Sequence, residues 1–478
     1  MTDEGVTMIA RRSALLLLLC VALLGAASSP AGAAATMPFL RPTPSAPCLA
    51  IPSVARAPEG RVWVRTFAYS AGQDRFMFSA LAPDGSLYAV GDGDVGLARD
   101  VIVAKYSAGG QLRWQQTWSV PGGSYGQGVG VDAAGSLYVA ATTMGPGGTW
   151  DFGLVKYSAG GVQQWARTFD GVGTDIDHVF ALVVAPDGRA YLTGESTGIM
   201  GSGYNLAVVA YGPDGALLWD ALYVGPTDYD AGYGICLDKH GDVLVTGTSQ
   251  SANGAAHCLT LKYSQSGALL WQSRYRPTPT SFARGGQVLS GADSTVYVAG
   301  GADTAGVDAS ILLAYSSAGH LKWARRYDGA KHMGSGTIAL AVSSSGSTWL
   351  AGMAARNSPW TVSAAFLISY DKRGRKRFSS EYRDATRSAS FGALQLAADG
   401  TAYCGGLVGD QFAADSDAVV ASYDPRGKRR WMDTYDGESA QADAIWALSL
   451  RPGKAVYAVG MTSAAASDVD GLVIKFRP

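Results

Sequence analysis

One short pattern recurs along most of the chain and constrains its fold more than any other feature. A tyrosine ends an alternating apolar run, a glycine follows four residues later, and a tryptophan follows four residues after the glycine, as in Tyr211, Gly215 and Trp219. Two alternating runs joined by a tight turn with glycine predict a β-hairpin. The same spacing returns at Tyr106/Gly110/Trp114, Tyr157/Gly161/Trp165, Tyr263/Gly267/Trp271, Tyr315/Gly319/Trp323, Tyr370/Gly374/Phe378 and Tyr423/Gly427/Trp431.

A second alternating apolar pattern, which also predicts a β-hairpin, lies between each Tyr–Gly–Trp hairpin and the next. Each repeat of about 50 residues therefore contains two hairpins, or four short antiparallel strands. In one copy we expect these strands at 180–184, 190–194, 206–211 and 216–223. A four-stranded sheet repeated at this period is typical of the blades of a β-propeller.

The two ends of the repeated region decide the number of blades. Trp63 stands in a first strand that has no tyrosine hairpin before it, and Phe476 ends a last strand that has no tryptophan strand after it. Pairing this N-terminal outer strand with the three C-terminal strands completes a blade and leaves no open sheet edge. The sequence thus predicts an all-β fold, an eight-bladed β-propeller of four-stranded antiparallel blades over residues 61–478. We expect the repeated aromatic residues in its core.

Residues 1–33 have the features of a secretory signal peptide. Arg11 and Arg12 precede an apolar run, and small residues follow it. The run is shorter than the stretch of about 20 apolar residues that a membrane-spanning helix needs. We expect cleavage after Ala33 or Ala35.

Residues 34–60 are rich in proline and predict a linker between this signal and the folded body. The expected location is therefore outside the cell, or in the periplasm or cell envelope. A lipoprotein anchored through Cys20 is an alternative, and we expect contact with a membrane only in that case.

Four cysteines would remain after cleavage, and they predict no site. Cys236 and Cys258 fall in the same repeat, on strands that we expect to be separated by a third strand. Two strand spacings amount to about 9.5 Å, which is too far for a disulfide. We therefore expect buried free cysteines at Cys236, Cys258 and Cys404, and Cys48 lies in the linker. The absence of a CxxC motif gives no indication of a zinc or redox site.

The repeat resembles a known family. The phrase from Asp151 to Trp165, followed by residues 184–194, is similar to the bacterial β-propeller repeat of SBBP type, which occurs in exported and surface proteins. The resemblance covers nearly all of residues 61–476 and implies the propeller fold and little about activity.

The chain also resembles, more distantly, the eight-bladed quinoprotein-like propellers, including an outer-membrane assembly lipoprotein. Those repeats carry aspartate four residues before the glycine, where this chain has tyrosine. Quinone-dependent dehydrogenases also have adjacent cysteines, which this sequence lacks. These departures argue against a quinone cofactor.

Acidic residues gather in the connections that follow the second and fourth strands of each repeat, which are longer and more variable than the other turns. A face rich in carboxylates attracts cations such as Ca²⁺, a basic peptide or a polyamine. We expect no cofactor, with Ca²⁺ as the one alternative. The candidate metal ligands are Asp92, Asp94, Asp175 and Asp177. The candidate ligand-binding residues on this face are Asp410, Asp415, Asp436, Glu438, Asp443 and Asp468.

A structural interpretation of the same residues stays open. Aspartate caps turns and keeps glycine-rich loops soluble. Asp100, Asp151, Asp417 and Asp470 recur just before the third strand of their repeats, which favours turn capping for these four. On the opposite face, two basic turns at 372–377 and 426–430 lie in adjacent repeats and are suited to anionic glycans or lipid head groups.

The sequence favours binding over catalysis. It contains no GxSxG, HExxH or P-loop motif. Its net charge of −1 gives no general basic field for nucleic acid. We expect a monomeric, non-catalytic scaffold that binds a protein or glycan ligand through the longer connections. The alternatives are a lyase or glycosidase with carboxylates near the ring axis, such as Asp177 and Asp230, and an envelope assembly lipoprotein.

Overall fold

The structure of the chain is a computed structural model. It describes residues 60–478 except 96–97, 146, 172–175, 198–202, 228, 252–253, 305, 358–361, 410–414, 438–440 and 466–467. The chain divides into two units, Met1–Pro52 and Ser53–Pro478. The expected signal peptide, Cys20, Cys48 and nearly all of the linker lie outside the described residues.

Within the described residues of the second unit, the chain forms 32 strands in eight four-stranded antiparallel sheets. Blades 1 to 4 comprise β2 (Asp74–Leu81), β3 (Leu87–Val95), β4 (Ala98–Tyr106), β5 (Leu112–Trp118); β6 (Ser124–Val131), β7 (Leu137–Met144), β8 (Trp150–Tyr157), β9 (Gln163–Phe169); β10 (Asp177–Val184), β11 (Ala190–Thr197), β12 (Tyr204–Tyr211), β13 (Leu217–Tyr223); and β14 (Asp230–Leu237), β15 (Val243–Gln250), β16 (Ala256–Tyr263), β17 (Leu269–Tyr275). Blades 5 to 8 comprise β18 (Ala283–Ser290), β19 (Val296–Thr304), β20 (Val307–Tyr315), β21 (Leu321–Tyr327); β22 (Ser335–Val342), β23 (Thr348–Ala355), β24 (Ser363–Tyr370), β25 (Lys376–Tyr382); β26 (Ala389–Leu396), β27 (Ala402–Gly409), β28 (Ser416–Tyr423), β29 (Arg429–Tyr435); and β30 (Ala444–Arg451), β31 (Ala455–Ala465), β32 (Asp468–Phe476) with β1 (Arg61–Phe67).

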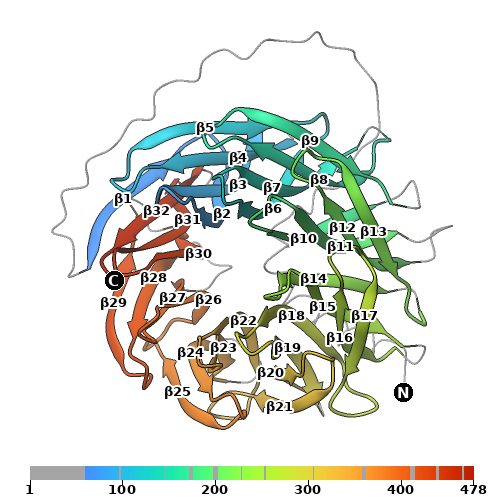
Figure 1. Cartoon of the computed structure of the whole chain (residues 1–478). Helices are drawn as coiled ribbons and strands as arrows, with labels where there is room; N and C mark the ends of the chain where they lie inside the picture. Colours follow the sequence, from blue (N-terminus) through green and yellow to red (C-terminus); the bar gives the residue numbers. More distant parts are fainter. Residues whose placement is uncertain are drawn as a thin grey trace, which may run out of the picture. The chain divides into compact units, whose positions relative to one another are not determined.

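The blades of this unit form a ring, which confirms the predicted eight-bladed propeller (Figure 1). The first strand of each blade, called strand A below, lies nearest the ring axis, and strands B, C and D follow outward. In the eighth blade the N-terminal β1 pairs with β32, with Trp63 opposite Lys475. This pairing closes the ring as the two orphan strands of the sequence predicted.

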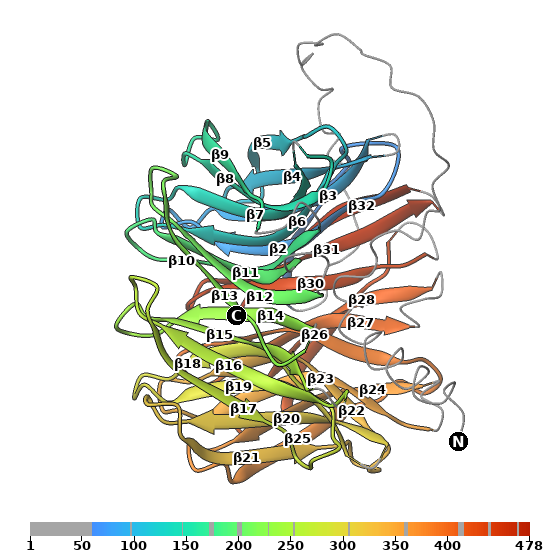
Figure 2. The same cartoon turned by 90° about the vertical axis from the view of Figure 1, so that its right-hand side faces the viewer.

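The strands of each blade run between the two faces of the ring, which Figure 2 shows from the side. The A–B and C–D turns lie on one face, which we call the turn face. The D–A and B–C connections lie on the other, which we call the loop face. This division follows from the antiparallel order of the strands in every blade.

The core lies between neighbouring blades. Each of eight apolar clusters combines buried residues from two adjacent blades. The repeated tyrosines are in these clusters; Tyr106 is 2 % exposed and Tyr315 is fully buried. Their predicted place in the core is therefore confirmed.

The repeated tryptophan and glycine form the joint between blades. Trp114 of β5 donates a hydrogen bond from Nε1 to the carbonyl oxygen of Ala159 in the next blade, at 3.1 Å. Gly161 lies against the same indole, has a φ of +88°, and would place a Cβ 2.7 Å from Trp114 Cδ2. A side chain at this position would therefore clash and strain the turn. The same indole-to-carbonyl bond joins Trp165 to Pro213, Trp219 to Gln265, Trp271 to Ser317 and Trp323 to Lys372.

Every strand A contains a β-bulge that the sequence patterns did not reveal. The register with strand B shifts after the third residue of strand A in blades 1 to 7 and after the second residue of β30 in blade 8, so the next residue has no partner on strand B. A bulge redirects a side chain and is frequent near functional sites. The residues at this position are Met77, Gln127, Phe180, Tyr233, Gly286, Ile338, Gly392 and Trp446.

The strands also extend further toward the loop face than predicted. Strand A of blade 3 begins at Asp177 instead of residue 180, and strand C begins at Tyr204 instead of 206. In blade 1, β3 ends at Val95 and β4 begins at Ala98, so this B–C connection is short. The expectation of long B–C loops is therefore wrong for blade 1. Glycine and aspartate interrupt the apolar alternation near the strand ends, which hides the strand from a pattern search.

The described cysteines all lie in strands of the propeller. Cys236, Cys258 and Cys404 are buried and free, as predicted, and β15 separates the strands of Cys236 and Cys258. In the described part of the chain, no helix is long and apolar enough to span a membrane.

Candidate functional site

The predicted metal ligands Asp92 and Asp94 lie in β3 on the loop face of blade 1, where arginines contact them. Arg75 Nη2 is 3.3 Å from Asp92 Oδ2, and Arg99 Nη1 donates a hydrogen bond to the same oxygen. Arg99 Nε is 2.9 Å from Asp94 Oδ1. Asp92 is 1 % exposed. Two guanidinium groups thus already neutralise these carboxylates, and a metal ion would have to compete with them.

Asp177 and Asp443 share a structural task with two other aspartates. Asp74, Asp177 and Asp230 are the first residues of their strands A, and Asp443 directly precedes β30. Each of the four accepts hydrogen bonds from the backbone of the preceding D–A connection, which stabilises the turn. The donor N–H groups are Gly171 to Asp177 at 2.6 Å, Gly437 to Asp443 at 2.7 Å, Gly225 to Asp230 at 2.6 Å, and Tyr69 and Ser70 to Asp74 at 2.5 and 2.7 Å. Asp177 and Asp230, the two residues considered for glycoside cleavage, are therefore each held by their own connection.

The remaining predicted loop-face residues differ in exposure. Asp415 and Asp436 are exposed, and Asp468 is half-buried. Burial, together with the charge of Asp436, raises the pKa of Asp443 to about 6. Asp175, Asp410 and Glu438 lie outside the described residues. Among the described residues, the charge of Asp436 therefore acts on Asp443, and the Asp443 N–H donates to the carbonyl oxygen of Ser416, which follows Asp415.

The four aspartates that were expected to cap turns lie inside strand C, not before it. Asp100 accepts a hydrogen bond from Tyr69 Oη at 3.0 Å, and Asp417 pairs with Arg387 at 3.0 Å. Asp151 and Asp470 differ, because Oδ1 of each is buried and has no hydrogen-bond partner among the described residues. The prediction that these four aspartates precede strand C was wrong, because these strands begin earlier than the apolar pattern suggests.

A polar and aromatic group on the inner strands of blades 3 and 4 is the best candidate for ligand binding. We call it the β10–β14 cluster; it comprises His178 and Phe180 of β10, Glu195 of β11, Tyr233 of β14 and Tyr229 just before β14. His178 Nδ1 is 3.1 Å from Glu195 Oε1. The rings of Phe180 and Tyr233 are 5.3 Å apart, and the Tyr229 and Tyr233 hydroxyls are 3.0 Å apart.

This cluster contains a buried carboxylate oxygen, and the charge of Arg284 acts on both of its tyrosines. Glu195 is 7 % exposed, and its Oε2 is buried without a hydrogen-bond partner among the described residues. Buried polar atoms normally have a partner, so such an atom requires an explanation. Burial and the charge of Glu195 raise the pKa of Tyr233 to about 12, and burial also raises the pKa of Tyr229. Both hydroxyls are therefore protonated at neutral pH.

The sequence patterns missed this cluster, although one signal for it exists. Phe180 and Tyr233 occupy the bulge position of strand A, where the residue type varies from glycine to tryptophan between repeats. A variable position on an otherwise regular scaffold is a sign of binding. The register shift that creates the position is a property of strand pairing, so only the structure identifies it.

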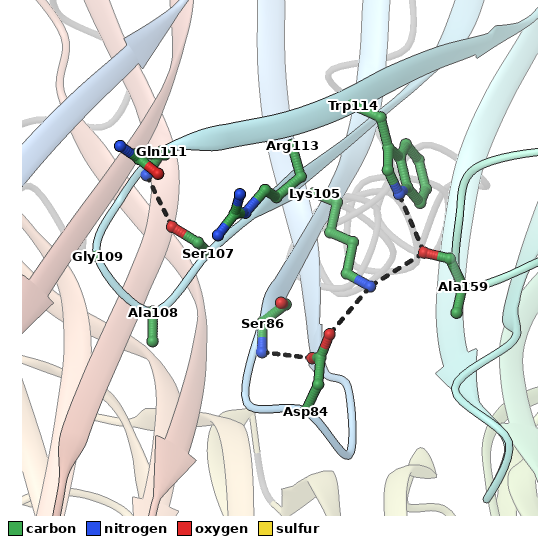
Figure 3. Close-up of a pocket in the computed structure, with 10 residues that line it drawn as sticks. All are labelled: Asp84, Ser86, Lys105, Ser107, Ala108, Gly109, Gln111, Arg113, Trp114 and Ala159. Atoms are coloured by element: carbon green, nitrogen blue, oxygen red, sulfur yellow. Dashed lines mark hydrogen bonds and ion pairs between the residues drawn. The ribbon is translucent and has the colours of Figure 1, made fainter.

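The turn face carries a shallow depression of about 780 Å³ in blade 1, beside the joint to blade 2 (Figure 3). Lys105 Nζ lies 3.3 Å from Asp84 Oδ2 and donates to the carbonyl oxygen of Ala159 at 3.0 Å, which also accepts from Trp114. In the next blade, Lys156 and Trp165 bind the carbonyl of Pro213 in the same way. These side chains hold blades together, and the depression follows from that repeated joint.

The two basic turns lie on adjacent blades, as expected, but part of their polar surface is used internally. Asp371 accepts hydrogen bonds from the backbone of Arg373 and Arg375 and pairs with the Arg375 side chain. Arg377 reaches the carbonyl of Pro425 in the next blade at 3.4 Å. Some of the basic residues in these turns therefore stabilise the hairpins and the joint between the blades.

Comparisons with known proteins support the fold. No protein-family model and no curated protein matches the sequence. The solved structure of Sqt1 from Chaetomium thermophilum is similar with a TM-score of 0.52, at 10 % identity, over 87 % of this chain and 100 % of that chain. At this identity the likeness shows the propeller fold alone.

Two further solved structures are more distant. Puromycin hydrolase matches with a TM-score of 0.48 at 13 % identity, over 83 % of this chain and 61 % of that chain. The β-propeller domain of the Trilobed protease from Pyrococcus furiosus matches with a TM-score of 0.41 at 9 % identity, over 73 % of this chain and 95 % of that chain.

Proposed function

We propose that the protein is a binding scaffold that captures a protein ligand on its loop face, by seating a lysine or arginine side chain in the β10–β14 cluster. The observation that carries this proposal is the buried Oε2 of Glu195, which has no hydrogen-bond partner among the described residues. A basic side chain supplies both the missing donor and the opposite charge.

The aromatic neighbours of Glu195 suit the same ligand. Phe180 and Tyr233 are half-buried, and their rings pack side by side from two neighbouring blades. A cation over an aromatic face gains about 0.5–2 kcal/mol. The exposed acidic residues Asp415 and Asp436 add a favourable long-range field for a basic ligand.

Binding of short peptides tests the proposal. Fluorescein-labelled hexapeptides that contain one or two lysines or arginines are titrated with the protein, and uncharged hexapeptides and neutral oligosaccharides serve as the comparison. We expect the basic peptides to bind and Glu195→Gln to weaken that binding by at least about tenfold, because a desolvated charge pair is lost.

A matched control removes the same charge elsewhere. Asp187 lies in the A–B turn of the same blade, on the turn face, so Asp187→Asn changes the net charge equally. We expect Asp187→Asn to leave peptide affinity within about twofold of the wild type, because surface charges contribute little. Equal losses in both variants, or binding of oligosaccharides without binding of basic peptides, would contradict the proposal.

We further propose that the protein is exported and is related to the SBBP-type repeat proteins. Support comes from the arginines and apolar run before Ala33 and from the repeat phrase Asp151–Trp165. N-terminal sequencing of the protein recovered from its natural host distinguishes the alternatives. A new N-terminus at Ala34 or Thr36 supports export with cleavage, an acylated Cys20 supports a lipoprotein, and an intact Met1 contradicts both.

A further inference from the structure

Three carboxylates meet where blade 2 joins blade 3 on the loop face. Asp151 is the second residue of β8, Asp170 follows the end of β9, and Asp177 is the first residue of β10. One carboxylate oxygen from each lies within 4.8 Å of the others. We call these three residues the seam cluster.

The burial of the seam cluster gives it an inner and an outer side. Asp151 and Asp177 are each 2 % exposed, whereas Asp170 is exposed. Asp177 is fixed in place, because its Oδ2 accepts the Gly171 N–H at 2.6 Å and its Oδ1 accepts the Thr197 N–H at 3.1 Å. Each carboxylate oxygen keeps a second lone pair for another partner. The cluster thus has two preformed ligands and one that is accessible from solvent.

A second observation concerns the carboxylate of Asp151. Oδ1 of Asp151 is buried and has no hydrogen-bond partner among the described residues, and no ion pair within them involves Asp151, Asp170 or Asp177. Burial, followed by the charges of Asp170 and Asp177, raises the pKa of Asp151 to about 6. The three carboxylates therefore face one another without a described basic partner, an arrangement that a bound cation would stabilise.

We propose that the seam cluster binds a divalent cation of the calcium type through Asp151, Asp170 and Asp177. Ca²⁺ takes oxygen ligands at about 2.3–2.6 Å, so ligands around one ion lie at most about 5 Å apart. The observed limit of 4.8 Å agrees with this geometry. Water and backbone oxygens complete the coordination sphere of such sites. The seam cluster shares no residue with the β10–β14 cluster, so this proposal does not rest on the proposed function.

The equivalent seam between blades 8 and 1 provides an internal control. Asp470 occupies the place of Asp151 in strand C, and its Oδ1 is also buried without a partner among the described residues. Burial and the charges of Asp468 and Asp74 raise the pKa of Asp470 to about 6. Among the described residues, however, only the seam cluster brings three carboxylates within 4.8 Å.

Thermal unfolding of the full chain tests the site. The protein is treated with EDTA, dialysed, and unfolded with and without about 1 mM CaCl₂, a concentration in the range where extracellular calcium modules bind. A ligand that binds the folded state raises Tm. We expect Ca²⁺ to raise the Tm of the wild-type protein by at least about 2 °C. Asp170→Asn should abolish most of this rise, and Asp470→Asn should keep it.

The choice of variants protects the test from a folding defect. Asp170 is exposed and its side chain has no described hydrogen bond, so its substitution should leave the fold intact. Tb³⁺ luminescence excited through tryptophan gives a local readout, because Trp150 directly precedes Asp151. Apparent Tb³⁺ affinity should fall at least tenfold in Asp170→Asn. The proposal is overturned if Ca²⁺ leaves the wild-type Tm unchanged, or if Asp170→Asn responds like the wild type, or if Asp470→Asn alone abolishes the response.

Discussion

Two groups of buried carboxylates on the loop face have opposite electrostatic settings. In blade 1, Asp92 lies between the guanidinium groups of Arg75 and Arg99. In the seam cluster, Asp151 and Asp177 are equally buried, but no described basic side chain pairs with them. Both groups have the same signature in the sequence, a set of aspartates near the ends of strands.

This difference shows that an aspartate in a repeat does not by itself indicate a cation site. What matters is whether a basic side chain already pairs with it. A carboxylate that has an arginine partner contributes to stability. Removing one member of such a pair leaves the other charge buried without a partner, which strongly destabilises the folded protein. A carboxylate without a partner reduces stability until a cation binds or a proton is taken up. Substitutions at the two sites should therefore change stability in opposite directions.

Asp92→Asn should have the largest effect. It removes the negative charge between two guanidinium groups, one of them on the buried Arg75, so we expect the free energy of unfolding to fall by about 3 kcal/mol. Urea unfolding at pH 7.5 measures this change. Asp94→Asn is the matched control, because the Asp94 side chain is 32 % exposed and should contribute less than about 1 kcal/mol. Equal effects of the two variants would show that Arg75 and Arg99 do not depend on Asp92.

The pH dependence of stability extends the comparison to Asp443, another buried carboxylate whose pKa is raised. The pKa rises from 3.8 to about 6, chiefly by burial, so the folded protein holds a proton that the unfolded chain releases. The contribution is favourable at low pH and is lost as pH increases from about 4 to about 6. The free energy of unfolding should therefore decrease between pH 4 and pH 7 by about 1–2 kcal/mol less in Asp443→Asn than in the wild type. Urea unfolding between pH 4 and pH 7 measures it, and an unchanged slope in the variant would contradict the assignment.

Asp151→Asn should stabilise the protein when divalent cations are absent. The substitution removes a buried charge that has no described ion pair and keeps the shape of the side chain, so the free energy of unfolding should rise by about 1 kcal/mol in EDTA. The same variant should gain nothing from added Ca²⁺. A loss of stability comparable to that of Asp92→Asn would show that an undetected partner neutralises Asp151.

Asp436→Asn should have the smallest effect. Asp436 is exposed, and its charge contributes to the raised pKa of Asp443. Its removal should lower the pKa of Asp443 slightly and change stability at pH 7.5 by less than about 0.5 kcal/mol. Carboxyl ¹³C shifts of Asp443 during a pH titration measure the shift, and a constant pKa in the variant would exclude the coupling.

The sequence predicted the ring because its evidence was repeated in every blade. The spacing of Tyr211, Gly215 and Trp219 reflects a local hairpin and a joint to the next blade, and both appear in the structure. The orphan strands at Trp63 and Phe476 predicted the closure of the ring. Agreement at this level needs only periodicity and strand pairing.

The site was less accessible to the same reasoning. The partners of Asp151 come from a different strand and a different blade, so their proximity depends on how the blades pack. The arginines beside Asp92 are likewise recognisable only once strands A, B and C are paired in register. The bulge at Tyr233 depends on a register shift that no residue pattern in one strand announces.

The most direct test of the difference between the two acidic groups is an anomalous difference map from a crystal of the protein soaked in CaCl₂. We predict a peak at the seam cluster, about 2.3–2.6 Å from a carboxylate oxygen of Asp151, Asp170 and Asp177, and none beside Asp92, where Arg75 and Arg99 supply the positive charge. A peak beside Asp92, or a seam cluster without one while Asp151 stays unpaired, would contradict the account.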